Sequence, residues 1–258
     1  GSEMCIRDSN KRYNMKKIMV RADDLGFSKA INYGIYETVK NGVIKNIGFM
    51  VNMPDSLHGY ELVKDYDICL GQHTNVCVGN PISDSESIPS LVQEDGTFKT
   101  SKMYRSTKED FVNLDEAILE VEAQYNRFKE ITGKEPAYFE AHAVMSENLN
   151  RAIEIVGNRH NLKTLIMGCE KVNGQDMHMY MDSMFPNYDP MASFKKMVDE
   201  AKDGFNMMVC HPGYLDQYIL SVSSLTMPRV LEADFLTSEE LKAYVKENNI
   251  HLYTYDEV

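Results

Sequence analysis

The chain has 258 residues, of which 43% are hydrophobic and 26% are charged, with a formal net charge of −12 and a pI of about 5.1. This length and apolar content suit one globular domain with a sizeable core. Binding to nucleic acid or to an anionic membrane surface requires concentrated Lys and Arg, so we expect neither partner for this acidic chain. No apolar run approaches the roughly 18–20 residues of a membrane span.

The first 14 residues differ from the rest of the chain. They show no periodicity and begin with Gly-Ser, a common remnant of tag removal, so we expect a non-native or disordered tail at 1–14 and a single domain over 15–258. No basic start is followed by an apolar segment that would indicate a signal peptide. The five cysteines contain no Cys-x-x-Cys pair, and we therefore expect a reduced, cytoplasmic protein.

From residue 15 onward, short apolar runs alternate with helical patterns. The expected strands are 17–22, 47–51, 68–71, 137–141, 164–167, 206–210 and 250–254. The expected helices are 28–39, 57–64, 114–132, 148–156, 191–201 and 238–246. The stretch 74–110 contains Pro, Gly and Ser with little periodicity, and it predicts a long loop that forms a substrate rim or lid.

Strands that alternate with helices predict a parallel α/β sheet. The two architectures that fit are a closed or nearly closed (β/α) barrel of about seven strands and an open doubly wound sheet. The phosphate-binding motifs GxGxxG and GxxxxGK[ST] do not follow the first strand, so a nucleotide-binding fold lacks its signature. Polar groups follow four different strands, which fits the mouth of a barrel better than one crevice at a switch point.

Those polar groups are candidates for metal binding and proton transfer. Asp23 and Asp24 follow the first expected strand, and His73, His142 and His211 follow the third, fourth and sixth. One Asp with two His is a common ligand set for a divalent metal, and it leaves one carboxylate and one imidazole for proton transfer. The two adjacent carboxylates should point to different sides, since side chains alternate along a strand.

Each candidate also has a purely structural reading. An Asp before a helix is often its N-cap, but Ser28 is available for that role. A lone His after a strand is more often structural, and only the joint placement of these residues favours function. Pro212 and Gly213 should hold His211 on a stiff loop, where glycine permits an otherwise strained backbone. We expect Cys77 to be incidental, and surface or packing roles for the remaining histidines, His58, His160, His178 and His251.

The motifs together resemble a known family. They are Ala-Asp-Asp-Leu-Gly-Phe-Ser at 22–28, Leu-Gly-Gln-His-Thr-Asn at 70–75, Glu-Ala-His at 140–142 and Cys-His-Pro-Gly-Tyr at 210–214, with PSLVQEDGTF at 89–98. In this order, and over nearly all of 17–255, they resemble the YdjC-like carbohydrate deacetylases, which include chitooligosaccharide deacetylases. The resemblance implies a deviant (β/α) barrel, one divalent metal ion, removal of N-acetyl groups from sugars, and a homodimer.

By this resemblance, Asp24, His73 and His142 are the metal ligands, Asp23 is the base and His211 is the acid. One motif departs from the family's pattern. Many relatives have Asp-Gly-His, whereas this chain has Glu140-Ala141-His142 followed by Ala-Val-Met. The expected ligand is kept and its neighbours are not, so we expect an effect on substrate choice or on the level of activity.

The implied chemistry is hydrolysis of a linear amide. A metal ion would polarise the acetyl carbonyl and lower the pKa of water, while the base and acid move protons. The ligand types favour Zn or Mg, and Co, Mn or Ni also fit. The chain has no Trp, so we expect Tyr214 and then Phe27 to stack on sugar. Arg229 and Glu232, in the loop before the last helix, either bind sugar hydroxyls or pair with each other.

Two other functions fit the same residues. One is a different metal-dependent hydrolase on the same barrel, such as an O-acetyl esterase or a small-amide hydrolase. The other is a non-catalytic, sugar-binding relative. The retention of two carboxylates and three histidines at strand ends argues against the second alternative, since binding alone needs no such set.

Overall fold

A computed structural model describes residues 16–166 and 171–258; the expected tail at 1–14 and part of the expected strand at 164–167 lie outside the described residues. The strands are β1 (Lys17–Leu25), β2 (Asn46–Phe49), β3 (Cys69–Thr74), β4 (Tyr138–Ala141), β5 (Lys163–Thr164), β6 (Lys171–Val172), β7 (Gln175–Tyr180), β8 (Phe205–Cys210) and β9 (Leu252–Tyr253). The helices are α1 (Lys29–Lys40), α2 (Ser56–Val63), α3 (Ser101–Ser106), α4 (Leu114–Thr132), α5 (Glu147–Arg159), α6 (Pro190–Asp199), α7 (Gln217–Val222), α8 (Met227–Thr237) and α9 (Glu239–Glu247).

The strands form one mostly parallel sheet in the order β5-β4-β3-β2-β1-β8-β7-β6, and β9 pairs with the start of β1. Strands that are consecutive in the chain are neighbours on both sides of β1, which is the order of a barrel and not of a doubly wound sheet. Side chains from both ends of this path, such as Leu165 and Met177, pack in one interior cluster with Met19 and Tyr138. The sheet is therefore nearly closed, and the predicted barrel is confirmed.

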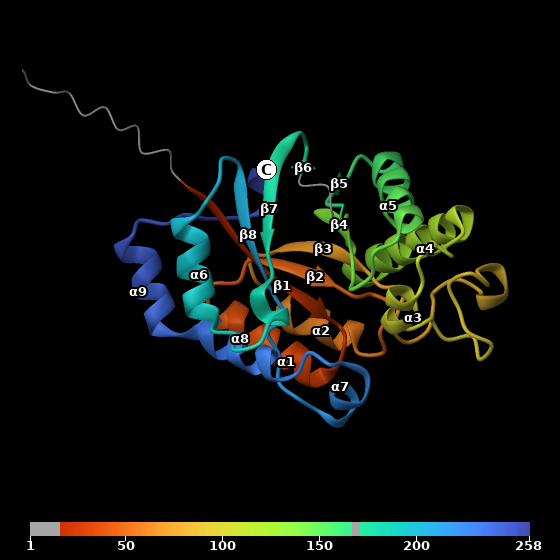
Figure 1. Cartoon of the computed structure of the whole chain (residues 1–258), viewed down its shortest axis with the longest axis horizontal. Helices are drawn as coiled ribbons and strands as arrows, with labels where there is room; N and C mark the ends of the chain where they lie inside the picture. Colours follow the sequence, from red (N-terminus) through yellow and green to blue (C-terminus); the bar gives the residue numbers. More distant parts are fainter. Residues whose placement is uncertain (1–15, 167–170) are drawn as a thin grey trace, which may run out of the picture.

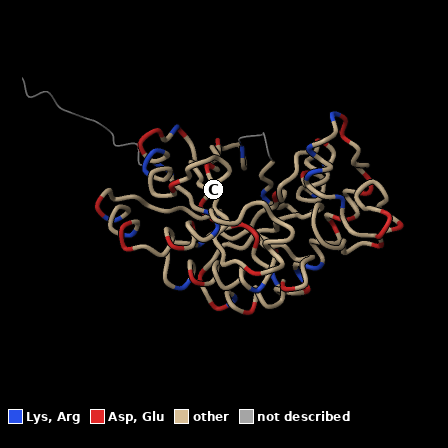
Figure 2. Tube along the Cα trace, turned by 60° about the horizontal axis from the view of Figure 1, so that its bottom comes forward, with Lys and Arg blue, Asp and Glu red and all other residues tan. Residues whose placement is uncertain are grey.

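Helices cover the outer face of this sheet. In Figure 1, α1, α2 and α8 lie below the strands, α6 and α9 lie on one side, and α4 and α5 lie on the other. One apolar cluster joins the strands to α1, α2, α6, α8 and α9, and a second joins β4 to α4, α5 and the segment between β3 and α3. Acidic and basic residues are interspersed around the outside (Figure 2). No helix among the described residues is long and apolar enough to cross a membrane.

Several elements were not predicted from the sequence: the hairpin of β6 and β7 and the helices α3, α7 and α8. The hairpin of β6 and β7 turns at Asn173 and Gly174, both with positive φ (50° and 76°). Asn-Gly is the strongest short signal for such a hairpin, so the information was present. The segment 227–237 was expected to be a loop, but it is the helix α8. The prediction was wrong because Pro228 lies at the start of the helix, where proline is well tolerated.

The loop after β8 is held against α1 by the close approach of two glycines. A Cβ on Gly34 would lie 2.4 Å from Gly213 Cα, and a Cβ on Gly213 would lie 2.4 Å from Ile31 Cδ1. Gly213 is not among the glycines with positive φ, so the expected reason for it, backbone strain, was wrong. The glycine is required by space, and the contact fixes the loop that carries His211.

This contact predicts the sign of a stability change. Replacing glycine by alanine inside a helix normally stabilises it by roughly 0.5–1 kcal/mol. We expect Gly34→Ala to destabilise the protein instead, by about 1–3 kcal/mol, because the new methyl group overpacks the loop. Thermal and denaturant unfolding measure the change. A stabilised Gly34→Ala variant would contradict the close approach of α1 and this loop.

Candidate metal centre

The two carboxylates at the end of β1 both line the same large cavity. The register of β1 against β2 shifts between Ala22 and Leu25, and Asp24 has a φ of 80°. This left-handed residue breaks the alternation of side chains, so the expectation that Asp23 and Asp24 point to different sides does not hold. Both are almost fully buried, at 2% and 0% exposure.

Two histidines from two other strand ends converge beside Asp24. Its Oδ1 lies 3.2 Å from His73 Nε2 and 3.0 Å from His142 Nδ1, and the two ring nitrogens are 2.9 Å apart. Oδ1 is buried and makes no hydrogen bond with any described residue. The spacing of one carboxylate oxygen and two imidazole nitrogens fits a divalent metal ion. The lack of a hydrogen bond at Asp24 Oδ1 also fits, because buried polar atoms normally have a partner.

The other oxygen of Asp24 is held by Arg229. Its Nη2 donates to Oδ2 at 2.7 Å, and its Nε donates to the carbonyl of Leu225. Arg229 was expected to bind substrate or to pair with Glu232; the structure places it at 1% exposure on the cavity wall, in an ion pair with Asp24. Burial raises the pKa of Asp24, but the Arg229 charge together with His142 and His73 outweighs this and holds the pKa well below its usual range.

Asp23 makes a second, separate ion pair. Arg21 Nε and Nη2 donate to its two oxygens at 2.7 and 2.6 Å. Burial raises the pKa of Asp23, but the Arg21 charge and hydrogen bonds, together with His73, outweigh this and lower the pKa below its usual value. The carboxylate is thus ionised, which is the form that can receive a proton, and it is oriented on both oxygens.

The imidazoles of His73 and His142 are proton-binding sites in the absence of metal. Burial lowers the pKa of both, but neighbouring carboxylates outweigh it. Glu140 and Asp23 raise the pKa of His73 well above its usual value, and Asp24 raises that of His142 to about 9. In the sequence, Glu140 stood out only as a departure from the family motif. In the structure, its carboxylate contacts His73 Nδ1.

His211 lies on the same cavity, on the loop after β8. Its backbone N–H donates to Glu232 Oε2 at 2.6 Å, and Tyr188 donates to the other Glu232 oxygen at 2.8 Å. Removal from bulk water lowers the pKa of His211 to about 4 and raises the pKa of Glu232 to about 7. Glu232 therefore supports the loop that carries His211, and it does not pair with Arg229.

The cavity has a volume of about 1370 Å³ and a largely apolar outer wall. Phe27 lines it and meets the rings of His142 and Tyr218 edge to face. Tyr218 also lines the cavity, whereas Tyr214, the first expected stacking residue, is 44% exposed and is not among the described lining residues. Cys77 is also among the residues that line the cavity. The lining also includes residues from the expected lid and methionines in and after β7: Gln93, Thr97, Phe98, Lys102, Arg105, Met179, Met181 and Met184.

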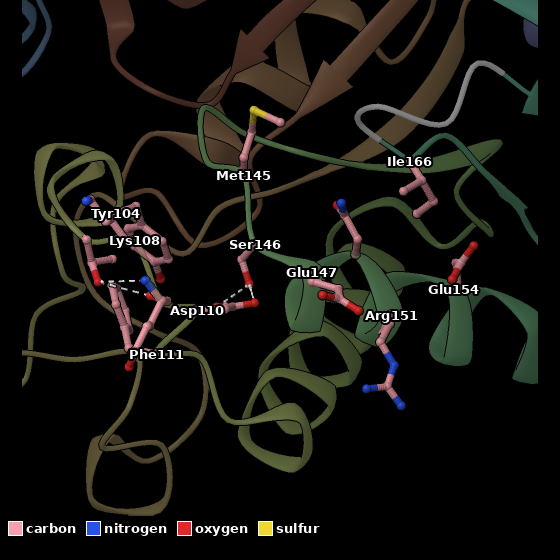
Figure 3. Close-up of a pocket in the computed structure, with 13 residues that line it drawn as sticks. Tyr104, Lys108, Asp110, Phe111, Met145, Ser146, Glu147, Arg151, Glu154 and Ile166 are labelled. Carbon is pink, nitrogen blue, oxygen red and sulfur yellow. Dashed lines mark hydrogen bonds between the residues drawn. The ribbon is translucent and has the colours of Figure 1, made fainter.

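Figure 3 shows a smaller pocket, of about 490 Å³, between the loop after α3 and the start of α5. This pocket and the large cavity share Tyr104, Thr107 and Met145. Asp110 accepts a hydrogen bond from the Ser146 hydroxyl at 2.9 Å and so joins the loop after α3 to the start of α5. The long segment before α4 therefore contributes to both recesses.

The raised pKa of Glu232 predicts a specific pH dependence of stability. The pKa of Glu232 is about 7 in the folded protein, against an ordinary value of 4.5. The stability that the protonated carboxyl contributes to the fold is therefore fully present below pH 4.5 and is lost as the pH rises through 7. The loss amounts to about 3 kcal/mol at 1.36 kcal/mol per pKa unit. We expect Glu232→Gln to be increasingly more stable than wild type between pH 5 and pH 8, measured by denaturant unfolding of the metal-free proteins.

The exposed Glu240 provides the control for this comparison, because its side chain is 67% exposed. Glu240→Gln should track the wild-type stability at each pH. If the curves of Glu232→Gln and wild type run parallel from pH 5 to pH 8, the assignment of a raised pKa to Glu232 is wrong.

Comparison with known proteins places this site in a family. A family model described as YdjC-like protein matches residues 17–247. The chain is 30% identical to carbohydrate deacetylase 2 of Listeria innocua (94% of this chain, 98% of that protein) and 27% identical to a chitooligosaccharide deacetylase of Citrobacter koseri (93% and 98%). A solved Enterococcus faecalis structure, named for a proposed role in cellobiose-phosphate cleavage, has a TM-score of 0.82 at 24% identity (94% and 98%), which shows a shared fold. The chain belongs to the YdjC-like protein family.

Proposed function

We propose that the protein is a metal-dependent hydrolase that removes N-acetyl groups from amino sugars or chitooligosaccharides. The observation that carries this proposal is the convergence of Asp24, His73 and His142 in a large cavity that Asp23 and His211 also line. The names of the relatives support a carbohydrate substrate and deacetylation as the reaction.

The donor set supports a divalent cation at this position. Two nitrogens and one carboxylate oxygen favour Zn, and Mg, Co, Mn or Ni are also compatible. Among the described residues, the buried carboxylates Asp23, Asp24 and Glu140 face two buried guanidinium groups, Arg21 and Arg229, so the cluster has one uncompensated negative charge when the imidazoles are neutral. A bound divalent ion polarises an amide carbonyl and lowers the pKa of water.

The protein's own groups provide the proton transfers. Asp23, ionised and oriented by Arg21, takes a proton from the attacking water. His211 then protonates the amine nitrogen as the C–N bond breaks, so that the sugar leaves as a neutral amine. The low pKa of His211 means that its ring is neutral in the free site. Negative charge that develops on the substrate nearby raises the proton affinity of His211, which takes up a proton from solvent and so reaches the form that this role requires.

The two adjoining recesses support an oligosaccharide as substrate. The large cavity holds the reacting N-acetyl sugar, with Phe27 and Tyr218 as the aromatic surfaces for its apolar face. A second sugar unit fits the smaller pocket, which shares the lining residues Tyr104, Thr107 and Met145 with the large cavity. We also propose a contact between Tyr214 and a substrate that extends to its exposed ring. Arg229 would contact a substrate that reaches its part of the cavity wall.

The proposal predicts acetate release that depends on metal. We expect acetate from N-acetylated mono- and oligosaccharides, loss of the activity in chelator, and recovery when Zn or Mg is added back, because the ion activates both water and carbonyl. An enzymatic acetate assay on a substrate panel measures this. Acetate release only from O-acetylated sugars or small amides would favour the alternative hydrolases, and binding of sugar without any release would favour the non-catalytic relative.

The proton-transfer roles predict a separation between turnover and metal binding. We expect Asp23→Asn and His211→Gln each to lower kcat by roughly 10²–10⁴-fold, because each removes one positioned acid or base. Zn affinity, measured by titration against a chromophoric chelator, should stay close to wild type in both. Asp199→Asn, at the exposed end of α6, is the matched control and should leave kcat unchanged. A kcat within a few-fold of wild type in either site variant would refute the assigned role.

A further inference from the structure

Two buried charged residues at the site neither bind the metal ion nor transfer a proton in the proposed reaction. Arg21 on β1 and Glu140 on β4 are 3% and 4% exposed. Burying charges is costly unless each is paired and hydrogen-bonded, so a pair kept inside a barrel needs a compensating function. Both residues contact groups that the reaction does use, and neither is a proposed metal ligand.

Glu140 acts on His73. Its Oε1 forms a short contact with His73 Nδ1, on the side of the ring opposite to Asp24. A carboxylate in this position keeps the proton on Nδ1, which leaves the Nε2 lone pair directed toward Asp24 and His142. The same contact fixes the rotation of the ring.

Arg21 acts on Glu140 and Asp23 together. It spans both oxygens of Asp23, and its Nη2 also lies 3.3 Å from Glu140 Oε2. Its Nη1 donates to the Tyr255 hydroxyl at 3.1 Å, and the Tyr255 ring stacks on Tyr138 at 3.8 Å between centroids. The hydrogen bond with Tyr255 thus fixes the guanidinium group of Arg21. The guanidinium group in turn sets the separation between the carboxylates of Asp23 and Glu140.

Gly48 on β2 provides the space for this arrangement. A Cβ at this position would lie 2.6 Å from Asp23 Oδ1, 3.1 Å from Glu140 Oε1 and 3.2 Å from His73 Cβ. The carboxylates therefore occupy the volume that a side chain on the central sheet would otherwise fill. Each oxygen of Glu140 accepts from a different donor, which a carboxylate can do and a neutral amide cannot.

We propose that Arg21 and Glu140 are positioning residues of the metal centre: Glu140 fixes His73 with its proton on Nδ1, and Arg21 fixes Glu140 relative to the base Asp23. The inference rests on the proposed function for the identity of the ligands and base. It adds that the affinity for the metal ion depends on the carboxylate of Glu140, which contacts the ligand His73 and not the ion.

The test is Glu140→Gln, which keeps the size of the side chain and removes one of its two acceptors. We expect Zn affinity to fall by about 10–100-fold, the usual cost of losing such a supporting carboxylate. Proton NMR of the Zn-loaded wild type should show a slowly exchanging, downfield Nδ1–H resonance of His73, and the variant should lose or shift it. Affinity is measured by chelator competition, independently of turnover.

Glu120 provides a matched control, because it is also fully buried and accepts hydrogen bonds at both oxygens, from the backbone N–H groups of Ile82 and Ser83. Glu120→Gln should lose stability but keep both Zn affinity and the resonance. If Glu140→Gln does not fold, Glu140→Asp keeps the charge but shortens the reach to His73, and it should show the same two changes in smaller degree.

Arg21→Lys tests the second half of the inference. Lysine keeps the charge but cannot hold both oxygens of Asp23, so kcat should fall while KM stays near wild type. Wild-type Zn affinity and an unchanged resonance in the Glu140 variants would overturn the inference and leave the proposed deacetylation intact. Zn binding with these changes but no acetate release would contradict the proposed function alone. A wild-type protein that binds no Zn would overturn both.

Discussion

The site depends on a balance of buried charge at the C-terminal ends of the strands. Three carboxylates and two guanidinium groups are buried together, each carboxylate in contact with an arginine, and Asp24 and Glu140 also in contact with a histidine. Isolated charges would be too costly at this depth, so every group is fixed by its partner. In the absence of metal, the same carboxylates favour protons on the imidazoles, which is why the pKa values of His73 and His142 are raised.

The fold supports this balance through backbone geometry. Asp24 turns into the cavity only because β1 leaves regular strand geometry at that point, and the carboxylates beside it fit only because β2 has Gly48 below them. On the opposite side, α8 supplies Arg229 to Asp24 and Glu232 to the loop of His211. One short helix thus connects the metal-binding side of the cavity to the expected acid.

Much of this was predictable from the sequence. Periodicity located most of the strands and helices, and polar residues after strands located the five side chains that the structure brings together, because parallel strands end at one edge. The partners of those side chains were not predictable. Arg229 and Asp24 are 205 positions apart, and Glu140 and Arg21 are 119 apart, so only the folded chain shows their pairing. Tyr218, and not Tyr214, reaches the cavity because α7 begins just after the glycine loop.

The central claim is that Asp24, His73 and His142 hold a metal ion. Anomalous X-ray scattering from Zn-soaked crystals tests it most directly. The account predicts one strong peak about 2.0–2.2 Å from Asp24 Oδ1, His73 Nε2 and His142 Nδ1. A peak instead between Asp23, Glu140 and His73 Nδ1, or no peak in the cavity at saturating Zn, would contradict it.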